Sequence, residues 1–466
     1  MSISDTPTGS LFARHALLPQ GWADDVLLQW DDAGTLTCVE AGLHPPAGTE
    51  RVDGVLLPGL PNLHSHAFQR AFAGLTEHRS AEQDSFWSWR ALMYGFAQSL
   101  TPDALQAIAT QLYIEMLQAG YTAVCEFHYV HHQPDGRVHA DAAEMSLRLV
   151  AAAREAGIGL TMLPVLYQAS GFGGKPALAE QRRFLNSVDG LLSLIGRLRH
   201  DGVRVGAAPH SLRAVPPEAL RDLLGGLHGA DASAPVHIHV AEQQREVDDC
   251  LAWIGQRPVQ WLLAHAAVDA RWCLVHATHL DASERRALAR SGAVAGLCPS
   301  TEANLGDGVF DAEAFIADGG VWGIGSDSHA CVDAAEELRL LEYGQRLTKQ
   351  RRNVLASAVH PQVADAMWLS AVAGGARASG RSIGGLRVGQ QADLVHLQAF
   401  DDAGLGAAQR LAGHVFATHG ARGVRDVWVA GRQRVHDGVH AAADRAAPAF
   451  IAARAQLLEH RWLENR

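Results

Sequence analysis

The sequence has few cysteines and no long hydrophobic run. Its 466 residues include six cysteines, and no two of them form a Cys-x-x-Cys pair. Scattered cysteines are typical of proteins from reducing compartments rather than of disulfide-stabilised secreted domains. The N-terminus lacks the basic start and apolar core of a signal peptide, and no apolar run is long enough to span a bilayer. The sequence therefore predicts a soluble cytoplasmic protein.

An excess of positive charge is also missing. The chain has 39 Lys and Arg against 50 Asp and Glu, a formal net charge of −11. This balance argues against nucleic acid or an anionic membrane as a partner, so any attraction for an acidic substrate has to be local. The hydrophobic content of 48% supports a substantial core. A chain of this length is too long for one compact domain unless that domain is a large barrel.

What the sequence does have is a pair of histidines one residue apart, directly after an apolar run. Residues 56–66 read Leu-Leu-Pro-Gly-Leu-Pro-Asn-Leu-His-Ser-His. On an extended backbone, residues i and i+2 point to the same side, so His64 and His66 can share one metal ion from the end of a strand. Two hydrogen-bonded structural histidines are the alternative, and this motif alone does not decide between them.

Four later apolar segments also end in polar or turn-forming groups. They span residues 235–242, 272–276, 293–300 and 321–328. They carry His239 with Glu242 three residues later, then His276, and finally Asp327. A TIM barrel places its chemistry at the C-terminal ends of its parallel strands. The ordered series therefore favours an active site at one end of such a barrel.

The central part of the chain alternates predicted strands with helices, the pattern of a parallel α/β sheet. Predicted barrel strands begin near Val55, Tyr121, Ile158, Val203, Val236, Cys273, Ala293 and Val321. We therefore predict a (β/α)8 TIM barrel over residues 58–381. Short strands near both ends predict a small β-sandwich domain formed by residues 1–57 and 382–466, and two unrelated appendages are the alternative.

The ordered set of H-x-H, His239, His276 and Asp327 resembles the amidohydrolase superfamily, in its single-metal deaminase branch. The resemblance spans roughly residues 56–381. More narrowly, three motifs resemble formimidoylglutamate deiminases of histidine degradation. These are Leu-His-Ser-His-Ala-Phe-Gln-Arg at 63–70, His-Ile-His-Val-Ala-Glu-Gln at 237–243 and Val-His-Ala-Thr-His at 275–279. The resemblance implies a sandwich split around the barrel and a homodimer.

The resemblance also implies a metal site. Its expected ligands are His64, His66, His239 and Asp327, a set that suits one Zn²⁺, or alternatively Fe²⁺. Related two-metal enzymes use a carboxylated Lys at the end of strand four, where this chain reads Gly-Ala-Ala-Pro-His-Ser at 206–211. His237 shares a strand face with His239 and is the competing ligand. His239 is preferred because Glu242 follows it.

The same resemblance implies the catalytic roles. Asp327 is expected to accept the proton of the attacking water as well as to bind the metal. Glu242 is expected to transfer protons to the reacting nitrogen, and His276 to hydrogen-bond the hydroxide or the substrate. The alternative for Glu242 is a solvent-facing carboxylate at a helix start.

The expected substrate-binding residues lie after the barrel strands or in the long segment 68–100, which is predicted to be a lid or a subunit contact. They are Gln69, Arg90, Tyr129, His210 and Arg213. Two guanidinium groups fit a small dicarboxylate substrate, since each can form a bidentate pair of hydrogen bonds with one carboxylate. We expect hydrolysis of N-formimidoyl-L-glutamate to N-formyl-L-glutamate and ammonia. The alternatives are a deaminase of a purine, pterin or other heterocycle, and a non-catalytic binding scaffold.

Overall fold

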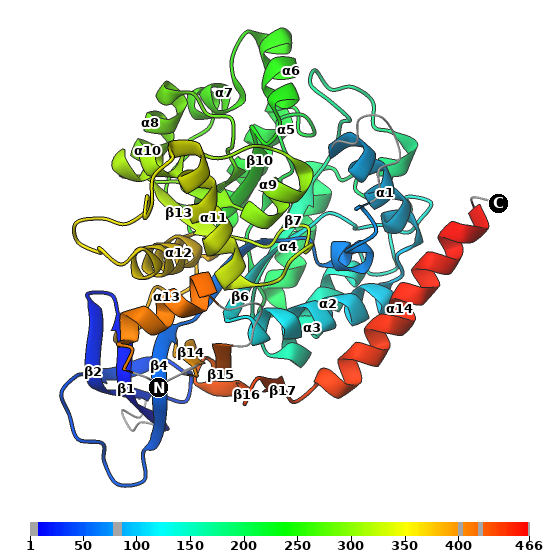
Figure 1. Cartoon of the computed structure of the whole chain (residues 1–466). Helices are drawn as coiled ribbons and strands as arrows, with labels where there is room; N and C mark the ends of the chain where they lie inside the picture. The colour runs from blue at the N-terminus through cyan, green and yellow to red at the C-terminus, as the bar shows by residue number, and fades with distance from the viewer. Residues whose placement is uncertain (1–7, 78–85, 399–403, 418–422, 465–466) are drawn as a thin grey trace.

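The computed structural model describes residues 8–77, 86–398, 404–417 and 423–464. A ring of helices surrounds a central barrel, and a separate sheet lies beneath one end of it (Figure 1). Within these ranges no helix combines the length and the apolar character needed to cross a membrane. The predicted lid, 68–100, is described only in part: its described portions form η1 (Ala67–Phe72) and α1 (Phe86–Ser99), and 78–85 lie outside the described residues.

The barrel is built from two parallel half-sheets. Their strands are β5 (Leu60–Ser65), β6 (Tyr121–His128), β7 (Gly159–Leu166), β8 (Arg204–Val205) and β9 (Ala208–Pro209), then β10 (Val236–Val240), β11 (Trp272–His276), β12 (Val294–Leu297) and β13 (Val321–Ile324). Parallel bridges join Ser65 to Asp327 and Ala207 to Val236, so the two half-sheets close on each other. The fold class is therefore the predicted TIM barrel.

The predicted position of the first barrel strand was wrong. Val55 lies in β4 (Glu50–Pro58), which belongs to the other sheet, and the barrel begins only at Leu60. The apolar run is continuous in sequence, but Gly59 divides it between two sheets. A Cβ at Gly59 would lie 2.3 Å from Thr122 Cγ2, so only glycine permits this close passage.

Helices cover the outside of the barrel, as the alternating pattern predicts. They are α2 (Pro102–Gln118), α3 (Glu144–Ala156), α4 (Val188–His200), α5 (Pro217–Ala230), α6 (Gln244–Ile254), α7 (Pro258–His265), α8 (Ala282–Ser291), α9 (Pro299–Leu305), α10 (Ala312–Ala317), α11 (Ala334–Lys349) and α12 (Val363–Ser379). Helix α2 begins at Pro102 because Thr101 Oγ1 accepts a hydrogen bond from Ala104 N at 3.1 Å.

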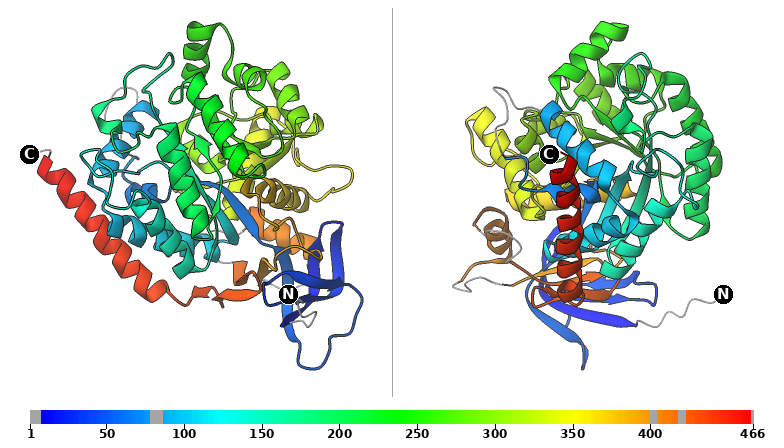
Figure 2. Two further views of the ribbon diagram at one scale, coloured as in Figure 1. Left: turned by 180° about the vertical axis from the view of Figure 1, so that it is seen from behind. Right: turned by 90° about the vertical axis from the view of Figure 1, so that its right-hand side faces the viewer.

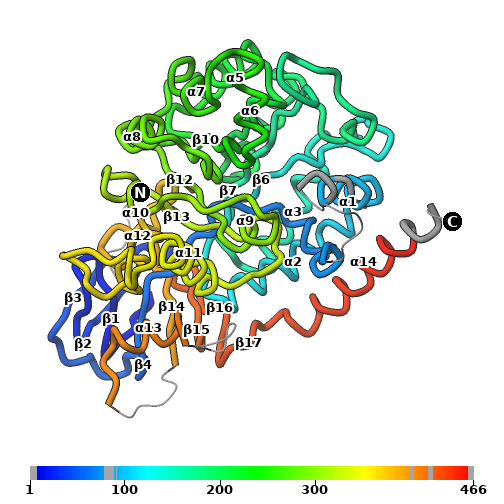
Figure 3. Tube along the Cα trace, turned by 45° about the horizontal axis from the view of Figure 1, so that its top comes forward, coloured from blue at the N-terminus to red at the C-terminus, as the bar shows by residue number. Residues whose placement is uncertain are grey.

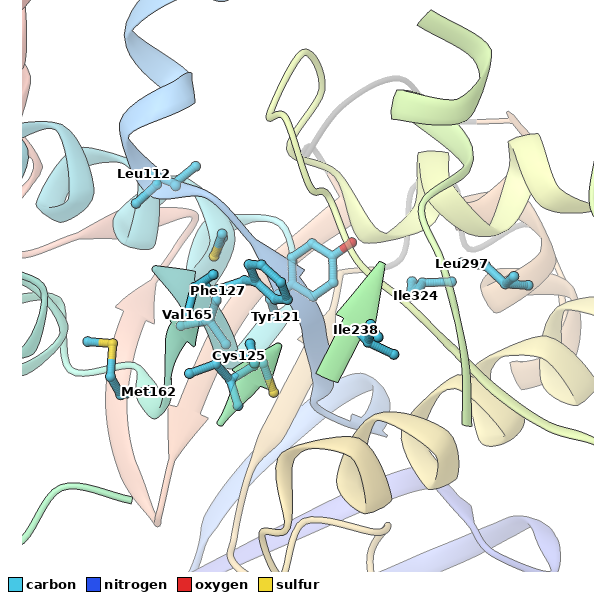
Figure 4. Packing of buried hydrophobic residues seen from close by; sticks show 14 of the residues in the cluster. Leu112, Tyr121, Cys125, Phe127, Met162, Val165, Ile238, Leu297 and Ile324 are labelled. Carbon is cyan, nitrogen blue, oxygen red and sulfur yellow. The ribbon is translucent and has the colours of Figure 1, made fainter. Parts of the chain in front are cut away.

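Buried side chains of the barrel strands and the surrounding helices form one connected core. Figure 4 shows part of it, with Phe127 from β6, Val165 from β7 and Ile238 from β10. Helix α12 approaches the barrel most closely where a Cβ at Gly374 would lie 1.8 Å from the carbonyl oxygen of Trp322. This packing fixes the strands from outside, so their C-terminal ends form a rigid support for side chains.

The second sheet takes its strands from both ends of the chain, as predicted. Its strands are β1 (Gly9–Leu18), β2 (Gly21–Trp30), β3 (Leu36–Glu40), β4, β14 (Leu394–Leu397), β15 (Val424–Val429), β16 (Arg432–His436) and β17 (Val439–His440), in the order β17-β16-β15-β14-β4-β1-β2-β3. Leu11 and Leu28 from the first strands share a buried cluster with Leu394 and Trp428. Figure 3 shows the blue and orange strands side by side.

The last helices return the chain to the barrel. They are α13 (Ala407–Ala417) and α14 (Ala443–Glu464). Helix α14 runs along the outside of α2 and reaches α1, as the red helix in Figure 2 shows. The C-terminal helix therefore packs against α2 and against α1 of the predicted lid.

Candidate active site

Three histidines and one aspartate meet at the C-terminal end of the barrel. Nε2 of His64 lies 3.2 Å from Nε2 of His66 and 3.0 Å from Nε2 of His239. Oδ1 of Asp327 lies 3.4 Å from His64 Nε2 and 3.3 Å from His66 Nε2. All four side chains are buried. The structure thus brings together the four residues that the sequence analysis expected to bind a metal.

Backbone carbonyls orient two of these rings. His66 Nδ1 donates to the carbonyl of Phe127 at 2.8 Å, and His239 Nδ1 donates to the carbonyl of His210 at 3.1 Å. A carbonyl only accepts, so the proton sits on Nδ1 and the Nε2 lone pair faces the other ligands. Burial holds the pKa of His64 and of His239 well below the usual range, which keeps these rings neutral.

The arrangement fits one divalent metal ion. Neutral Nε2 lone pairs so close together repel one another unless a cation accepts them. Tetrahedral bonds of about 2.0–2.1 Å place neighbouring ligand atoms roughly 3.3–3.4 Å apart, close to the separations among His64, His66 and Asp327. The donor set and its spacing therefore suit a transition metal such as Zn²⁺.

Residues with a positive φ angle orient several side chains of the site. Asp327 has φ 47°, His276 has φ 66°, and Ala241, next to Glu242, has φ 52°. Non-glycine residues rarely adopt this conformation, and it concentrates at functional sites. His276 ends β11, Ala241 follows β10 directly, and Asp327 lies three residues beyond β13, where the chain has to turn. The turns let side chains point across the barrel mouth.

The other two residues expected to act in catalysis, His276 and Glu242, lie beside the expected metal ligands. His276 Nε2 is 3.8 Å from Glu242 Oε1 and 3.6 Å from Asp327 Oδ2. Burial opposes protonation of His276, but Glu242, Asp327 and Glu302 outweigh it and raise its pKa to about 10. Burial raises the pKa of Glu242. The pair therefore combines a cationic imidazole with a carboxyl group that holds protons more tightly than usual.

The sequence analysis missed Glu302, which orients His276. Its Oε1 lies 3.3 Å from His276 Nδ1 and accepts a hydrogen bond from Cys298 N at 2.9 Å. Glu302 is buried in the short helix α9, directly after β12. The signal was a carboxylate four residues beyond the apolar segment 294–298, at the same end of the barrel as the other site residues.

The five expected substrate-binding residues line one cavity together with His66, His239 and Asp327. The five are Gln69, Arg90, Tyr129, His210 and Arg213. Gln69 Nε2 donates to the Tyr129 hydroxyl at 2.9 Å, and the Arg90 guanidinium lies over the Tyr94 ring, 5.5 Å from its centroid. Arg213 also forms ion pairs with two glutamates. Its Nη2 lies 3.8 Å from Glu242 Oε2, and its Nε lies 4.0 Å from Glu246 Oε2.

Aromatic residues that were not singled out from the sequence complete the cavity wall. Tyr94 and Tyr167 both face it, and their hydroxyls accept hydrogen bonds from Gln181 Nε2 at 2.9 and 2.7 Å. Gln181 is fully buried, so it fixes both rings. The abundance of Trp, Tyr and Phe in segment 68–100 was the available signal for Tyr94.

Two other histidines considered from the sequence lie apart from the cavity lining. His237 Nε2 donates to the carbonyl of Ala378 at 2.8 Å, and burial lowers its pKa to about 4. His279 Nε2 donates to the carbonyl of Asp307 at 2.8 Å. Both side chains therefore connect strand ends to neighbouring backbone.

A closed parallel barrel with three histidines and an aspartate at its C-terminal end defines the class of metal-dependent barrel hydrolases. The chain belongs to the amidohydrolase family, whose model matches residues 55–434. Residues 8–53 match the N-terminal domain of formimidoylglutamate deiminase HutF. These matches confirm the resemblance stated from the sequence.

Individual relatives agree with this assignment. The chain is 53% identical over 459 residues to a formimidoylglutamate deiminase of Pseudomonas aeruginosa, covering 97% of this chain and 100% of that protein. It is 30% identical to an 8-oxoguanine deaminase of the same species, over 73% of each chain. An amidohydrolase crystal structure from Brucella melitensis superposes with a TM-score of 0.92 at 47% identity, covering 97% of this chain and 100% of the other.

A more distant structure shares the fold alone. An adenosine deaminase from Xanthomonas campestris, described with bound zinc, superposes with a TM-score of 0.78 at 23% identity, over 97% of this chain and 98% of that one. The same overall fold thus recurs in proteins with different activities, so the substrate has to be argued from the cavity.

Proposed function

We propose that the protein hydrolyses N-formimidoyl-L-glutamate to N-formyl-L-glutamate and ammonia in histidine degradation. The observation that carries the proposal is the placement of Arg90 and Arg213 in the same cavity as the metal ligands. This substrate has two carboxylates and one electrophilic C=N carbon, which matches two guanidinium groups beside a hydrolytic centre. Similarity to a formimidoylglutamate deiminase over nearly the whole chain supports the same substrate.

The proposed cofactor is one Zn²⁺ per chain, held by His64, His66, His239 and Asp327. When bound, the metal would supply Lewis-acid activation of a water molecule near neutral pH. Three imidazoles and a carboxylate are ordinary zinc ligands. The adenosine deaminase of the same fold is described with zinc, which supports this choice over Fe²⁺.

The protein's own groups then move the protons. Asp327 Oδ2 accepts a proton from the attacking water, 3.6 Å from the Nε2 of His276. The imidazolium of His276 donates a hydrogen bond that stabilises charge as the C–O bond forms at the formimidoyl carbon. Glu242 protonates the terminal nitrogen, which gives a tetrahedral intermediate with an –NH2 group. Asp327 then passes its proton to this nitrogen and Glu242 takes the proton of the new hydroxyl, so that the C=O bond forms, the C–N bond breaks and ammonia leaves. Burial raises the pKa of Glu242, which favours its role as a proton donor.

The cavity wall positions the substrate. Arg90, above the ring of Tyr94, binds one carboxylate, and Arg213 binds the other while it also balances Glu242 and Glu246. Gln69, Tyr129 and His210 contact the formimidoyl end near the metal ligands. The homodimer and the cytoplasmic location stay predictions.

The test is ammonia release by the purified, metal-replete protein. N-formimidoyl-L-glutamate is compared with N-formimidoylglycine, which lacks the side-chain carboxylate, and with 8-oxoguanine. We expect the dicarboxylate to give the highest kcat/KM and N-formimidoylglycine a far higher KM. A preference for 8-oxoguanine would replace the proposal with heterocycle deamination. A metal-loaded protein without turnover of any of the three would favour a binding scaffold.

A further inference from the structure

A second cleft lies at the opposite end of the barrel from the metal ligands. It has a volume of about 540 Å³, and its lining includes Gly159 and Arg204, where β7 and β8 begin. Strand β7 runs from this cleft to Leu166, directly before Tyr167 in the active-site cavity. The volume falls in the range of small-molecule sites, roughly 300–1,000 Å³.

Arginines from four parts of the chain line this cleft. They are Arg154 of α3, Arg204 of β8, Arg381 after α12, and Arg432 and Arg434 of β16. Arg432 and Arg434 both come from β16 and both line the cleft. Gln433 between them donates instead to Asp426 Oδ1 at 3.2 Å. We call these five residues the arginine cleft.

Glycines leave room for two of these guanidinium groups, and hydrogen bonds position a third. A Cβ at Gly157 would lie 2.5 Å from Arg434 Nε, and one at Gly380 would lie 2.5 Å from Arg204 Nη2. Arg381 is anchored by hydrogen bonds to the carbonyl of Leu160 at 3.2 Å and to Gln391 Oε1 at 3.3 Å. The charges are therefore brought together by the fold and not by carboxylate partners.

Little negative charge offsets the arginine cleft. Asp32 is the acidic residue in its lining, and within the described ranges none of the five arginines forms an ion pair within 4.0 Å. Two carboxylates outside the lining act on the cleft at longer range. Asp231 is bound to Arg199 at 3.1 Å, and Arg204 also helps to lower its pKa. Asp393 accepts from Ala430 N at 2.8 Å, and Arg381 partly offsets the burial that raises its pKa.

The guanidinium groups also have unused hydrogen-bonding capacity. The Nε atoms of Arg204, Arg381 and Arg434 are buried without a hydrogen-bond acceptor among the described residues. Burial and the neighbouring Arg432 lower the pKa of Arg434, as expected for a charge without a counterion. Buried donors and unbalanced charge are costly in the free protein, and an anion would relieve both.

We propose that the arginine cleft binds a small polyanion that carries phosphate or carboxylate groups. Guanidinium groups bind both oxyanions through paired N–H donors. A long polyanion such as nucleic acid is excluded because it would extend beyond the cleft over a protein with a net charge of −11. The site is separate from the residues of the proposed reaction, so it does not depend on which substrate is hydrolysed.

The test is calorimetric titration of the metal-replete protein at low ionic strength with inorganic phosphate and, separately, tricarballylate. Inorganic phosphate tests for a ligand with phosphate groups, and tricarballylate tests for a ligand with carboxylate groups. The test variants are Arg434→Gln, Arg154→Gln and the double variant Arg432→Gln/Arg434→Gln. Arg137→Gln is the control for the single variants, because Arg137 is exposed and pairs with Asp135, and its replacement changes the net charge by the same amount as either single variant. Ammonia release and thermal unfolding of every variant verify that the active site and fold are intact.

We expect saturable binding of at least one probe to the wild type and to Arg137→Gln. Affinity is expected to fall at least tenfold in the double variant, and severalfold in Arg154→Gln, whose exposed position makes misfolding an implausible cause. Tighter binding of phosphate or of tricarballylate identifies the ligand group. The proposal fails if neither probe saturates, if the variants bind like the control, or if the variants change only the oligomeric state.

Discussion

Ser65 and Asp327 are bridge partners where the last barrel strand meets the first, and this bridge lies within the metal site. Asp327 N donates to the carbonyl of His64 at 3.0 Å, and His66 N donates to the carbonyl of Asp327 at 3.2 Å. Ser65 points away from the ligands, and its hydroxyl donates to Glu126 Oε2 at 2.6 Å. Closure of the barrel and assembly of the ligand set are therefore one structural event.

Metal removal should consequently destabilise the protein. We expect elemental analysis to give about one transition-metal ion per chain. Dialysis against a chelator should lower the melting temperature, since ligand repulsion returns and the binding free energy is lost. A second group, His276, Cys298 and Asp327, shares a ligand with the first. Two equivalents of metal, both required for activity, would contradict the single-metal site.

Two histidines of β10 provide a matched comparison. His239→Ala should remove most of the metal, because its Nε2 lies 3.0 Å from that of His64. His237→Ala should retain the metal but unfold at a lower temperature, because it loses a buried hydrogen bond to Ala378. Metal content and melting temperature of both variants are measured together. The opposite pattern of metal loss would make His237 the ligand.

Glu242→Gln should bind metal normally and lose turnover. The amide cannot deliver a proton to the leaving nitrogen, and general acid–base catalysis typically contributes about a hundredfold or more. Metal analysis and the ammonia assay distinguish this result from a damaged site. Near-normal kcat with full metal content would reduce Glu242 to a structural role.

The grouping of the four expected metal ligands followed from the family resemblance together with two geometric rules. Alternation along a strand places His64 and His66 on one side, and parallel strands bring their C-terminal ends together. Glu302 could not be assigned in this way. Its contact with His276 depends on how the short helix α9 packs over the barrel mouth, which no local pattern specifies.

Similar reasons explain why other features of the structure differ from the sequence predictions or were not predicted. The apolar run through Val55 carries no sequence signal that it serves two sheets, since that division depends on the close passage of Gly59 past Thr122. The residue type and position of Arg213 predicted its place in the cavity. Its contacts with Glu242 and Glu246 could not be predicted, because three positions on two segments determine them only in the folded chain.

Glu302→Gln should lower the pKa of His276. Burial disfavours the imidazolium, and Glu242, Glu302 and Asp327 together raise the pKa to about 10, so loss of one carboxylate charge shifts it down. The amide can still accept from Cys298 N, which preserves the local fold. We expect kcat to fall several-fold and the alkaline limb of the kcat–pH profile to move to lower pH. A profile identical to the wild type would remove Glu302 from the site.

Glu337 should contribute a measurable pH dependence of stability. Burial, partly offset by hydrogen bonds from Ser300, raises its pKa to about 8. Because the folded pKa exceeds the usual 4.5, the folded state holds the proton more tightly. The resulting stability is present below pH 4.5 and is lost as the pH rises through about 8, by at most about 1.4 kcal/mol per pH unit.

Urea unfolding between pH 5 and pH 8.5 tests this expectation. Glu337→Gln should show a smaller fall in the free energy of unfolding across this range than the wild type. Glu155→Gln is the control, because Glu155 is exposed on α3. Equal slopes for wild type and Glu337→Gln would show that Glu337 ionises normally in the folded protein.

The two arginines of the cavity should differ in their effects on kinetics. Arg90 lies over Tyr94, whereas Arg213 lies within 4.0 Å of two buried carboxylates, those of Glu242 and Glu246. Arg90→Gln should raise KM for N-formimidoyl-L-glutamate with a smaller change in kcat, because Arg90 is proposed to bind a substrate carboxylate and does not lie within 4.0 Å of Glu242 as Arg213 does. Arg213→Gln should raise KM and lower kcat, since the pKa of Glu242 rises when its cationic neighbour is removed.

Removing one partner of a buried charge pair typically costs about 2–5 kcal/mol, or roughly thirtyfold and more in kcat/KM. N-formimidoylglycine separates the two carboxylate sites, because it keeps only one carboxylate. The arginine that binds the side-chain carboxylate should affect the glycine analogue much less than the full substrate. If both variants weaken both substrates equally while metal content is unchanged, neither arginine recognises that carboxylate, and its binding group has to be sought elsewhere in the cavity wall.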